Sequence, residues 1–222
     1  MSVDEITPKI WRRFLIKEEI MFQELHDVIQ IVMGWDDYHL FEFQIGDVCI
    51  SADEEGHNLA ESGFKKLYQS PEFIEMLEQT KLKNGSANLD MNKLNKILKE
   101  QEKKKPAQKC VLKSKINLLI NSEKQKFNYV YDFGDNWEHT LVVEKILDSS
   151  DAPFIPFCLA GERACPPEDC GSIGGYYELQ KIKKNKNHKE YNERIVNWLG
   201  EDFDFEKINI DEINKELHKL VN

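Results

Sequence analysis

Residues 127–143 read FNYVYDFGDNWEHTLVV, and this stretch predicts a β-hairpin. The segment Gly134-Asp135-Asn136 has the composition of a tight turn, because Gly and Asn accept positive φ angles. Aromatic side chains share one face of the strand predicted over 127–133: Tyr129, Tyr131 and Phe133. The strand predicted over 137–146 returns with one apolar side. The centre of the fold is therefore expected to be antiparallel sheet.

Outside this hairpin, the spacing of apolar residues predicts further strands and helices. Strands are predicted over 10–16, 39–45, 48–51 and 116–120. Helices are predicted over 21–33, from about 71, and over 89–104, 176–183, 191–199 and 211–220. The helix over 21–33 has the clearest stripe, formed by Phe22, Leu25, Ile29 and Val32. Strands grouped on both sides of a helical middle predict an α+β fold, a single compact domain with a mixed or antiparallel sheet and packed helices.

The charge is distributed unevenly along the 222 residues. Between Lys81 and Lys126 there are 13 lysines and four acidic residues, a local charge of +9 that leaves −19 for the rest of the chain. The polar, lysine-rich block at about 51–110 is interpreted as a helical insertion into one domain spanning 1–222. Lysine runs without arginine or aromatic residues are typical of solvated helix faces, so this reading is preferred to a nucleic-acid surface.

The composition excludes several classes of protein. A net charge of −10 and 41% hydrophobic residues are typical of a globular chain with a core. The first residues have no apolar signal region, and no stretch approaches the length of a membrane helix. Five cysteines in a chain of this size fit a reducing compartment better than a disulfide scaffold. We therefore expect a cytoplasmic protein that does not contact a membrane.

Two motifs carry groups that can do chemistry. At the hairpin, Asp132, Asp135 and His139 could bind a metal or act as acid and base. The alternative is that the two carboxylates accept hydrogen bonds from turn N–H groups while His139 packs in the core. The Asp-Phe-Gly triplet lacks the other motifs of a protein kinase.

The second motif runs from Gly161 to Gly171 and reads GERACPPEDCG. Its paired prolines present Glu168 and Asp169 from a rigid loop, where they could hold a hard cation or cap helix N–H groups. Cys165 and Cys170 are weak metal candidates, together with His139, because no second cysteine pair accompanies them. The glycines that follow are interpreted as a turn, since the lysine of a phosphate-binding loop is missing.

Four segments occur together, in order: Pro8-x-Ile10-Trp11-Arg12-Arg13, the stretch 25–43, the stretch 131–139 and the stretch 161–171. In this combination the chain resembles the plasmid pRiA4b ORF-3-like family, whose members are also labelled insertion-element passenger proteins of resolvase type. The resemblance covers about 6–50 and 116–200 and implies one compact α+β domain. Family members carry a full strand before the first motif, so the seven residues before Pro8 are expected to form only a short one.

The resemblance implies no established reaction. It singles out polar residues that we expect to share one binding site: Arg12, His39, Asp132, Asp135, His139, Glu168 and Asp169. Of the adjacent arginines, Arg13 is expected to be solvated and Arg12 to pair with an acid. No recombinase constellation accompanies these residues. The sequence therefore favours a non-enzymatic binding or interaction module associated with plasmids or mobile elements, with an unidentified protein or nucleic-acid partner.

Two alternatives remain open. In the first, Asp132, Asp135, His139, Glu168 and Asp169 hold a divalent metal that activates water, as in a metal-assisted hydrolase or nuclease. In the second, the segment Lys81–Lys126 binds nucleic acid without sequence preference.

Overall fold

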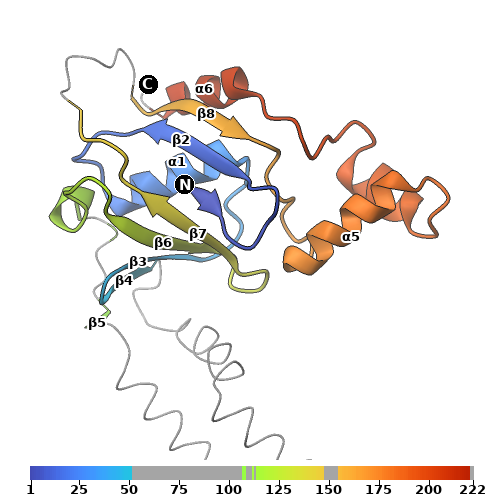
Figure 1. The fold of residues 1–222 in the computed structure, drawn as a ribbon, viewed down its shortest axis with the longest axis horizontal. Coiled ribbons are helices and arrows are strands. Elements are labelled where there is room, and N and C mark those ends of the chain that lie inside the picture. Colours follow the sequence, from blue (N-terminus) through green and yellow to red (C-terminus); the bar gives the residue numbers. More distant parts are fainter. Residues whose placement is uncertain (52–106, 109–111, 113, 148–154, 221–222) are drawn as a thin grey trace, which may run out of the picture.

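An eight-stranded sheet organises the protein, in the order β5-β4-β3-β6-β7-β1-β2-β8. The computed structural model describes residues 1–51, 107–108, 112, 114–147 and 155–220 (Figure 1). The strands are β1 (Ser2–Val3), β2 (Trp11–Leu15), β3 (Phe41–Ile45), β4 (Val48–Ser51), β5 (Ala107–Gln108), β6 (Lys126–Tyr131), β7 (Trp137–Val142) and β8 (Phe157–Glu162). All neighbouring strands pair antiparallel except β4 and β5. The expected α+β class with a mixed sheet is confirmed.

Helices pack on the sheet and extend from its end. They are α1 (Phe22–Met33), the 3₁₀ helix η1 (Ile116–Leu118), α5 (Ser172–Lys184), the π-helix η3 (Tyr191–Leu199) and α6 (Ile210–Lys219). Helix α1 lies across one face of the sheet, α6 runs beside β8, and α5 with η3 forms an arm beyond the sheet (Figure 1). Within the described ranges, no helix has the length and apolar character needed to cross a membrane.

The predicted helix over 21–33 is confirmed. Its apolar stripe, Phe22, Leu25, Ile29 and Val32, is fully buried against the sheet. Gly34 ends the helix in the left-handed region at φ 86°, which glycine adopts without steric cost. The chain can therefore turn sharply from α1 into the segment 35–40 that precedes β3.

The predicted hairpin is also confirmed, with Tyr131 opposite Trp137 at its closed end. Tyr129 and Tyr131 are completely buried, as alternation requires. The first strand ends at Tyr131, so Phe133 belongs to the turn rather than to the strand. The second strand ends at Val142, four residues earlier than predicted.

Other predictions need correction. The segment 116–120 is a 3₁₀ turn and not a strand, because Ile116 and Ile120 are buried one helical turn apart while Leu118 is 68% exposed. Strand β8 was not predicted. The expected short first strand is the two-residue β1. The predicted helices from about 71 and over 89–104, and most of the insertion at about 51–110, lie outside the described residues.

Gly174 and Gly175 lie in helix α5, whereas the sequence analysis interpreted them as part of a turn. Helix α5 begins at Ser172, with Gly171 as its N-cap at φ 92°. A Cβ atom at Gly175 would lie 1.8 Å from the carbonyl oxygen of Cys170. Only glycine allows this close approach between the helix and the chain before it.

Arg12 joins three parts of the fold and does not pair with an acid, contrary to expectation. Its side chain is 2% exposed. The guanidinium group donates to the carbonyl oxygens of Val32 (2.7 Å), Trp11 (2.8 Å), Glu162 (2.9 Å) and Arg163 (2.8 Å). These acceptors belong to the last turn of α1, to β2 and to the end of β8. Burial lowers the pKa of Arg12, since water is replaced by neutral carbonyl groups.

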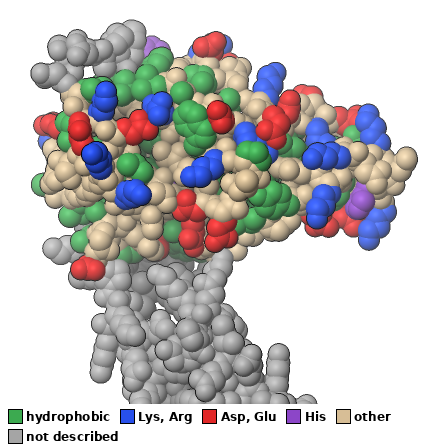
Figure 2. Space-filling model, in the orientation of Figure 1, with side chains coloured by type: hydrophobic (Ala, Val, Ile, Leu, Met, Phe, Trp, Pro, Cys, Tyr) green, Lys and Arg blue, Asp and Glu red, His purple; other side chains and the backbone are tan. Residues whose placement is uncertain are grey.

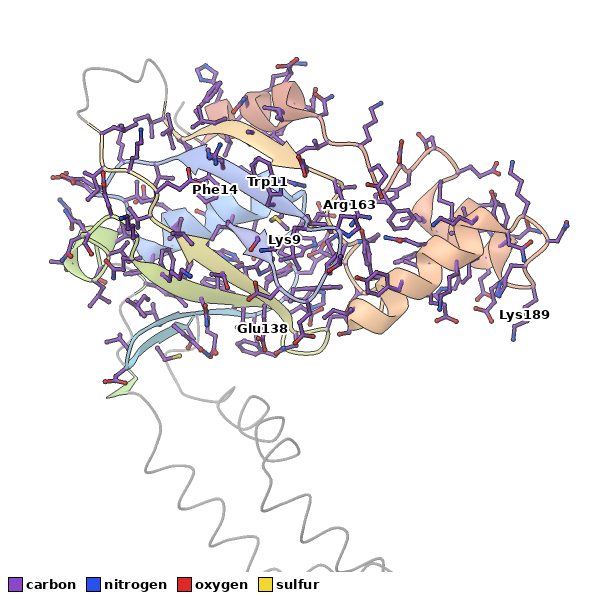
Figure 3. The ribbon with its side chains drawn as sticks, viewed as in Figure 1. Lys9, Trp11, Phe14, Glu138, Arg163 and Lys189 are labelled. Carbon is purple, nitrogen blue, oxygen red and sulfur yellow. The ribbon has the colours of Figure 1, made fainter. Side chains whose placement is uncertain are left out.

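Two further residues support this junction. A Cβ atom at Gly161 would lie 2.9 Å from Cδ of Arg12, so glycine leaves room for the guanidinium stem. Arg163, at the junction between the sheet and the arm (Figure 3), donates two hydrogen bonds to the carboxylate of Glu206. Its third bond goes to the carbonyl of Pro8 (2.6 Å).

Replacing Arg12 with methionine should lower the free energy of unfolding by about 3 kcal/mol or more, because it leaves buried carbonyl groups without donors at ~1–3 kcal/mol each. Urea denaturation of the full chain measures the change. The matched control is Arg13→Met, since Arg13 is half exposed and pairs with Glu144 at 2.7 Å. That control should cost less than about 1 kcal/mol. Equal losses in the two variants would contradict the role assigned to Arg12.

Candidate functional site

Three segments meet at one end of the sheet, beside a depression that the first two of them line: 35–40 after α1, the β6–β7 turn 132–136, and the loop 165–171. Hydrogen bonds between the segments hold them together. Trp35 Nε1 donates to the carbonyl of Pro166 (2.9 Å), and the N–H of Gly171 donates to Asp135 (3.0 Å). We call this region the acidic cleft, because its side chains include the carboxylates of Asp36, Asp37, Asp132, Asp135, Glu168 and Asp169.

Within this region His39, Asp132 and Asp169 lie close together. The two ring nitrogens of His39 face different carboxylates, with Nδ1 3.7 Å from Asp132 Oδ1 and Nε2 3.3 Å from Asp169 Oδ1. One potential ligand atom from each residue lies within 4.8 Å of the other two. A depression of about 180 Å³ opens here, lined by Tyr38, His39, Leu40, Asp132, Phe133 and Gly134.

Asp132 and Asp135 also shape the turn, as the alternative reading of the sequence proposed. Asp132 adopts a left-handed φ of 55°, and its Oδ1 accepts the N–H groups of Gly134 (2.9 Å) and Asp135 (3.3 Å). Asp135 accepts from Gly171, which ties the turn to the start of α5. Asp132 therefore serves both the turn and the cleft, whereas the carboxylate of Asp135 links two segments.

Glu168 connects the loop 165–171 to the segment 35–40 and to the end of β6. One carboxylate oxygen accepts from the hydroxyl of Tyr131, and the other accepts the N–H of Asp36 at 3.0 Å. The same hydroxyl accepts the N–H of Tyr38 at 3.1 Å. Burial, followed by the hydrogen bond to Glu168, raises the pKa of Tyr131, so its hydroxyl stays protonated and donates. Glu168 positions the segment that carries His39.

The sequence analysis did not identify His26, which holds the segment 35–40 in place through Asp37. Its Nε2 lies 2.8 Å from Asp37 Oδ1 and its Nδ1 lies 2.8 Å from the hydroxyl of Tyr129. The ring stacks on Phe41 with centroids 3.5 Å apart. Burial lowers its pKa, opposed by the bond to Asp37. The available signal was its position four residues after Phe22, which places a titratable side chain on the buried face of α1.

Two members of the expected shared site lie outside the cleft. Arg12 is bound to backbone carbonyls in the core, as described above. His139 is completely buried, with Nδ1 3.2 Å from the carbonyl oxygen of Tyr129. Burial lowers the pKa of His139 to about 3, so its ring is neutral near pH 7. The structure thus brings together five of the seven predicted residues.

The four cysteines within the described residues, Cys49, Cys158, Cys165 and Cys170, are buried and form no disulfide. Burial raises the pKa of Cys165 well above its usual range and that of Cys170 to about 12, so neither thiol is ionised near neutral pH. In the part of the chain that the structure describes, the one group of potential metal ligands is His39, Asp132 and Asp169. The lysine-rich segment Lys81–Lys126 lies mostly outside the described residues, and its role in nucleic-acid binding stays a prediction.

Comparisons with known proteins give one family match and two similar proteins. The family model described as "Plasmid pRiA4b ORF-3-like protein" matches residues 1–212. The chain is 24% identical over 221 residues to uncharacterized protein y4hQ of Sinorhizobium fredii, covering 99% of this chain and 89% of that protein. It is also similar to the crystal structure of a protein of unknown function, MM3350, from Methanosarcina mazei Go1. That comparison has a TM-score of 0.66 and 30% identity, over 95% of this chain and 93% of the other.

The burial of His139 predicts how stability depends on pH. The unfolded chain binds a proton at this ring below about pH 6.5, whereas the folded chain resists protonation until about pH 3. The free energy of unfolding should therefore fall as the pH is lowered from 6.5 towards 3, by up to ~1.4 kcal/mol per pH unit for this group. The lowered pKa of His26 acts in the same direction.

Urea denaturation between pH 7 and pH 4.5 measures this dependence. The variant His139→Leu should show a shallower slope than the wild type, since it removes one proton-binding group from the unfolded chain. Leu141→Ala is the matched control, because Leu141 is also buried in β7 and carries no titratable group, so its replacement should lower the free energy of unfolding without changing the slope. Equal slopes in His139→Leu and the wild type would show that His139 is not the group responsible.

Proposed function

This chain belongs to the plasmid pRiA4b ORF-3-like family, and we propose that it acts as a non-enzymatic binding module. Its ligand would be a positively charged segment of a partner protein, bound over the acidic cleft. The observation that supports this proposal most directly is that the segments 35–40, 132–136 and 165–171 come together to form an exposed, acidic surface. The association with plasmids or mobile elements expected from the family's labels, and a cytoplasmic location, stay predictions.

The charge of the cleft supports a cationic ligand. In the described structure, none of the cleft carboxylates forms an ion pair with lysine or arginine, and the basic side chains that contact them are the imidazoles of His39 and His26. Asp169 is 71% exposed and Asp37 is 53% exposed. Such a surface repels phosphate groups and attracts lysine and arginine side chains.

Exposed apolar groups beside the carboxylates add a contact surface. Tyr38 is 77% exposed and Leu40 is 41% exposed, and both line the depression. An arginine above the ring of Tyr38 would gain ~0.5–1 kcal/mol from the cation–π interaction while its charge faces the neighbouring acids. The combination of an aromatic ring and acidic groups favours an arginine-containing segment.

Several polar groups that a catalyst could use are buried or already hydrogen-bonded, which supports a binding role rather than a catalytic one. His139, which a hydrolase could use as a base, is buried away from the cleft. Glu168 is occupied by the hydroxyl of Tyr131 and the N–H of Asp36. The thiol of Cys170 has a pKa of about 12. The face of the sheet opposite α1 mixes basic and acidic side chains (Figure 2), which does not favour a phosphate-binding surface there.

The proposal is tested by titrating the full chain with a hexa-arginine peptide at low salt, followed by backbone NMR. Amide shifts should concentrate in residues 36–40, 132–136 and 168–171. Tyr38→Ala should weaken binding about two- to fivefold, the ratio that corresponds to the cation–π energy. Leu118→Ala is the matched control, because Leu118 is also exposed (68%) but lies on η1. Shifts spread evenly over the surface, or equal effects of the two variants, would overturn the proposal.

A further inference from the structure

We infer that His39, Asp132 and Asp169 form a binding site for one first-row divalent transition-metal ion, such as Zn²⁺ or Mn²⁺. The inference goes beyond the proposed function, because it assigns these three side chains to an inorganic ion, whereas the proposed peptide contact depends on Tyr38. It also replaces the metal-ligand set expected from the sequence. His139 and Glu168 are committed elsewhere, and His39 supplies the nitrogen.

The three side chains lie close to one another. One potential ligand atom from each residue lies within 4.8 Å of the other two. Ligand atoms about 2.0–2.2 Å from a first-row ion lie about 3–3.5 Å from one another in tetrahedral or octahedral sites. Nε2 of His39 is 3.3 Å from Asp169 Oδ1, which matches that spacing, whereas the contact of 3.7 Å to Asp132 Oδ1 is made by Nδ1 on the other side of the ring. Binding of one ion therefore requires the side chains to draw together around one of the two ring nitrogens.

The hydrogen bonding of His39 leaves a nitrogen available. Its Nε2 is buried and has no hydrogen-bond partner, although Asp169 Oδ1 is 3.3 Å away. Coordination to an ion would satisfy this buried nitrogen, which has no hydrogen bond in the free protein. The side chain of His39 is 24% exposed, so the ring still has a path to solvent.

The surroundings provide the support that a metal ligand needs. Asp132 is oriented by the N–H groups of Gly134 and Asp135, in the way that outer hydrogen bonds orient metal-binding carboxylates. The segment that carries His39 is fixed by Glu168 through Asp36 N–H. Two carboxylates balance the charge of a divalent ion, and the further carboxylates of the cleft favour its entry.

The donor set indicates the class of ion. An imidazole nitrogen with two carboxylate oxygens suits Zn²⁺, Fe²⁺, Co²⁺ and Mn²⁺, whereas Mg²⁺ and Ca²⁺ prefer oxygen ligands alone. Zn²⁺ should bind more tightly than Mn²⁺, following the general order of divalent affinities. Three protein ligands leave at least one coordination position for water or a ligand atom.

Isothermal titration calorimetry of the full chain with Zn²⁺, Mn²⁺ and Mg²⁺ tests the site. The wild type should bind one Zn²⁺ with higher affinity than Mn²⁺, and Mg²⁺ should bind weakest. Asp169→Asn should lower Zn²⁺ affinity at least about tenfold, the smallest effect expected for a direct ligand. The side chain is exposed and asparagine accepts the left-handed φ of 55°, so this variant should fold.

Asp36→Asn is the matched control, since it removes a neighbouring exposed charge without removing a ligand, and it should change Zn²⁺ affinity less than threefold. His39→Gln is the second ligand variant and should also lose at least about tenfold. Circular dichroism establishes that each variant is folded. No binding by the wild type at millimolar metal, or equal affinity in wild type, Asp169→Asn and His39→Gln, would overturn the inference. Neither outcome affects the peptide titration, which depends on Tyr38 and is performed without metal.

Discussion

The buried guanidinium of Arg12 is the interaction on which the rest of the structure depends. A charge that is 2% exposed must be compensated, and here four carbonyl oxygens compensate it in place of a carboxylate. One of them, Val32, belongs to the last turn of α1, where the helix dipole places partial negative charge. The cation therefore holds the end of α1 against β2 and the end of β8 at the same time.

The acidic cleft is a consequence of this junction. Because the carbonyl of Arg163 accepts from Arg12, the chain leaving β8 is fixed beside the end of α1. Three residues later the carbonyl of Pro166 accepts from Trp35, and the loop then reaches the segment 35–40 through Glu168 and Asp36. The loop 165–171 thus crosses the chain that emerges from α1. Where the two segments meet, Asp169 lies beside His39, although these residues are far apart in the sequence.

Periodicity in the sequence was sufficient to predict the elements that bury a regular face. The stripe of α1, the alternation of Tyr129 and Tyr131, and the turn between β6 and β7 all repeat with the spacing of their secondary structure. Strand β8 has no such spacing: opposite Arg13 and Phe14 of β2 it has an extra residue, Leu159, and its side chains do not alternate regularly between buried and exposed. The apolar run 116–120 fits both a strand and a helical turn, and the positions of its buried residues decide the outcome.

The polar residues were harder to assign, because residue type does not reveal the partner. Arg12 was expected to meet an acid, and backbone carbonyls leave no signal in the sequence that could have corrected this. His26 and His39 are chemically identical, yet one is enclosed between Tyr129 and Asp37 while the other opens on a depression. The motifs identified the correct loops, but the sequence could not separate the groups that build the cleft from those available to a ligand.

In the structure, the contacts of each motif residue show whether it builds the cleft or is available to a ligand. Glu168 and Asp135 accept hydrogen bonds from backbone N–H groups and from a hydroxyl, and the buried ring of His139 contacts a backbone carbonyl, so these three residues serve the fold. Asp169 is different, because its contact within the described structure is with His39 and 71% of its side chain is exposed. Its backbone is left-handed at φ 55°, where glycine or asparagine would be at least as stable. A carboxylate at that position adds charge to the cleft without supporting its architecture, and the same charge acts on any cation that enters.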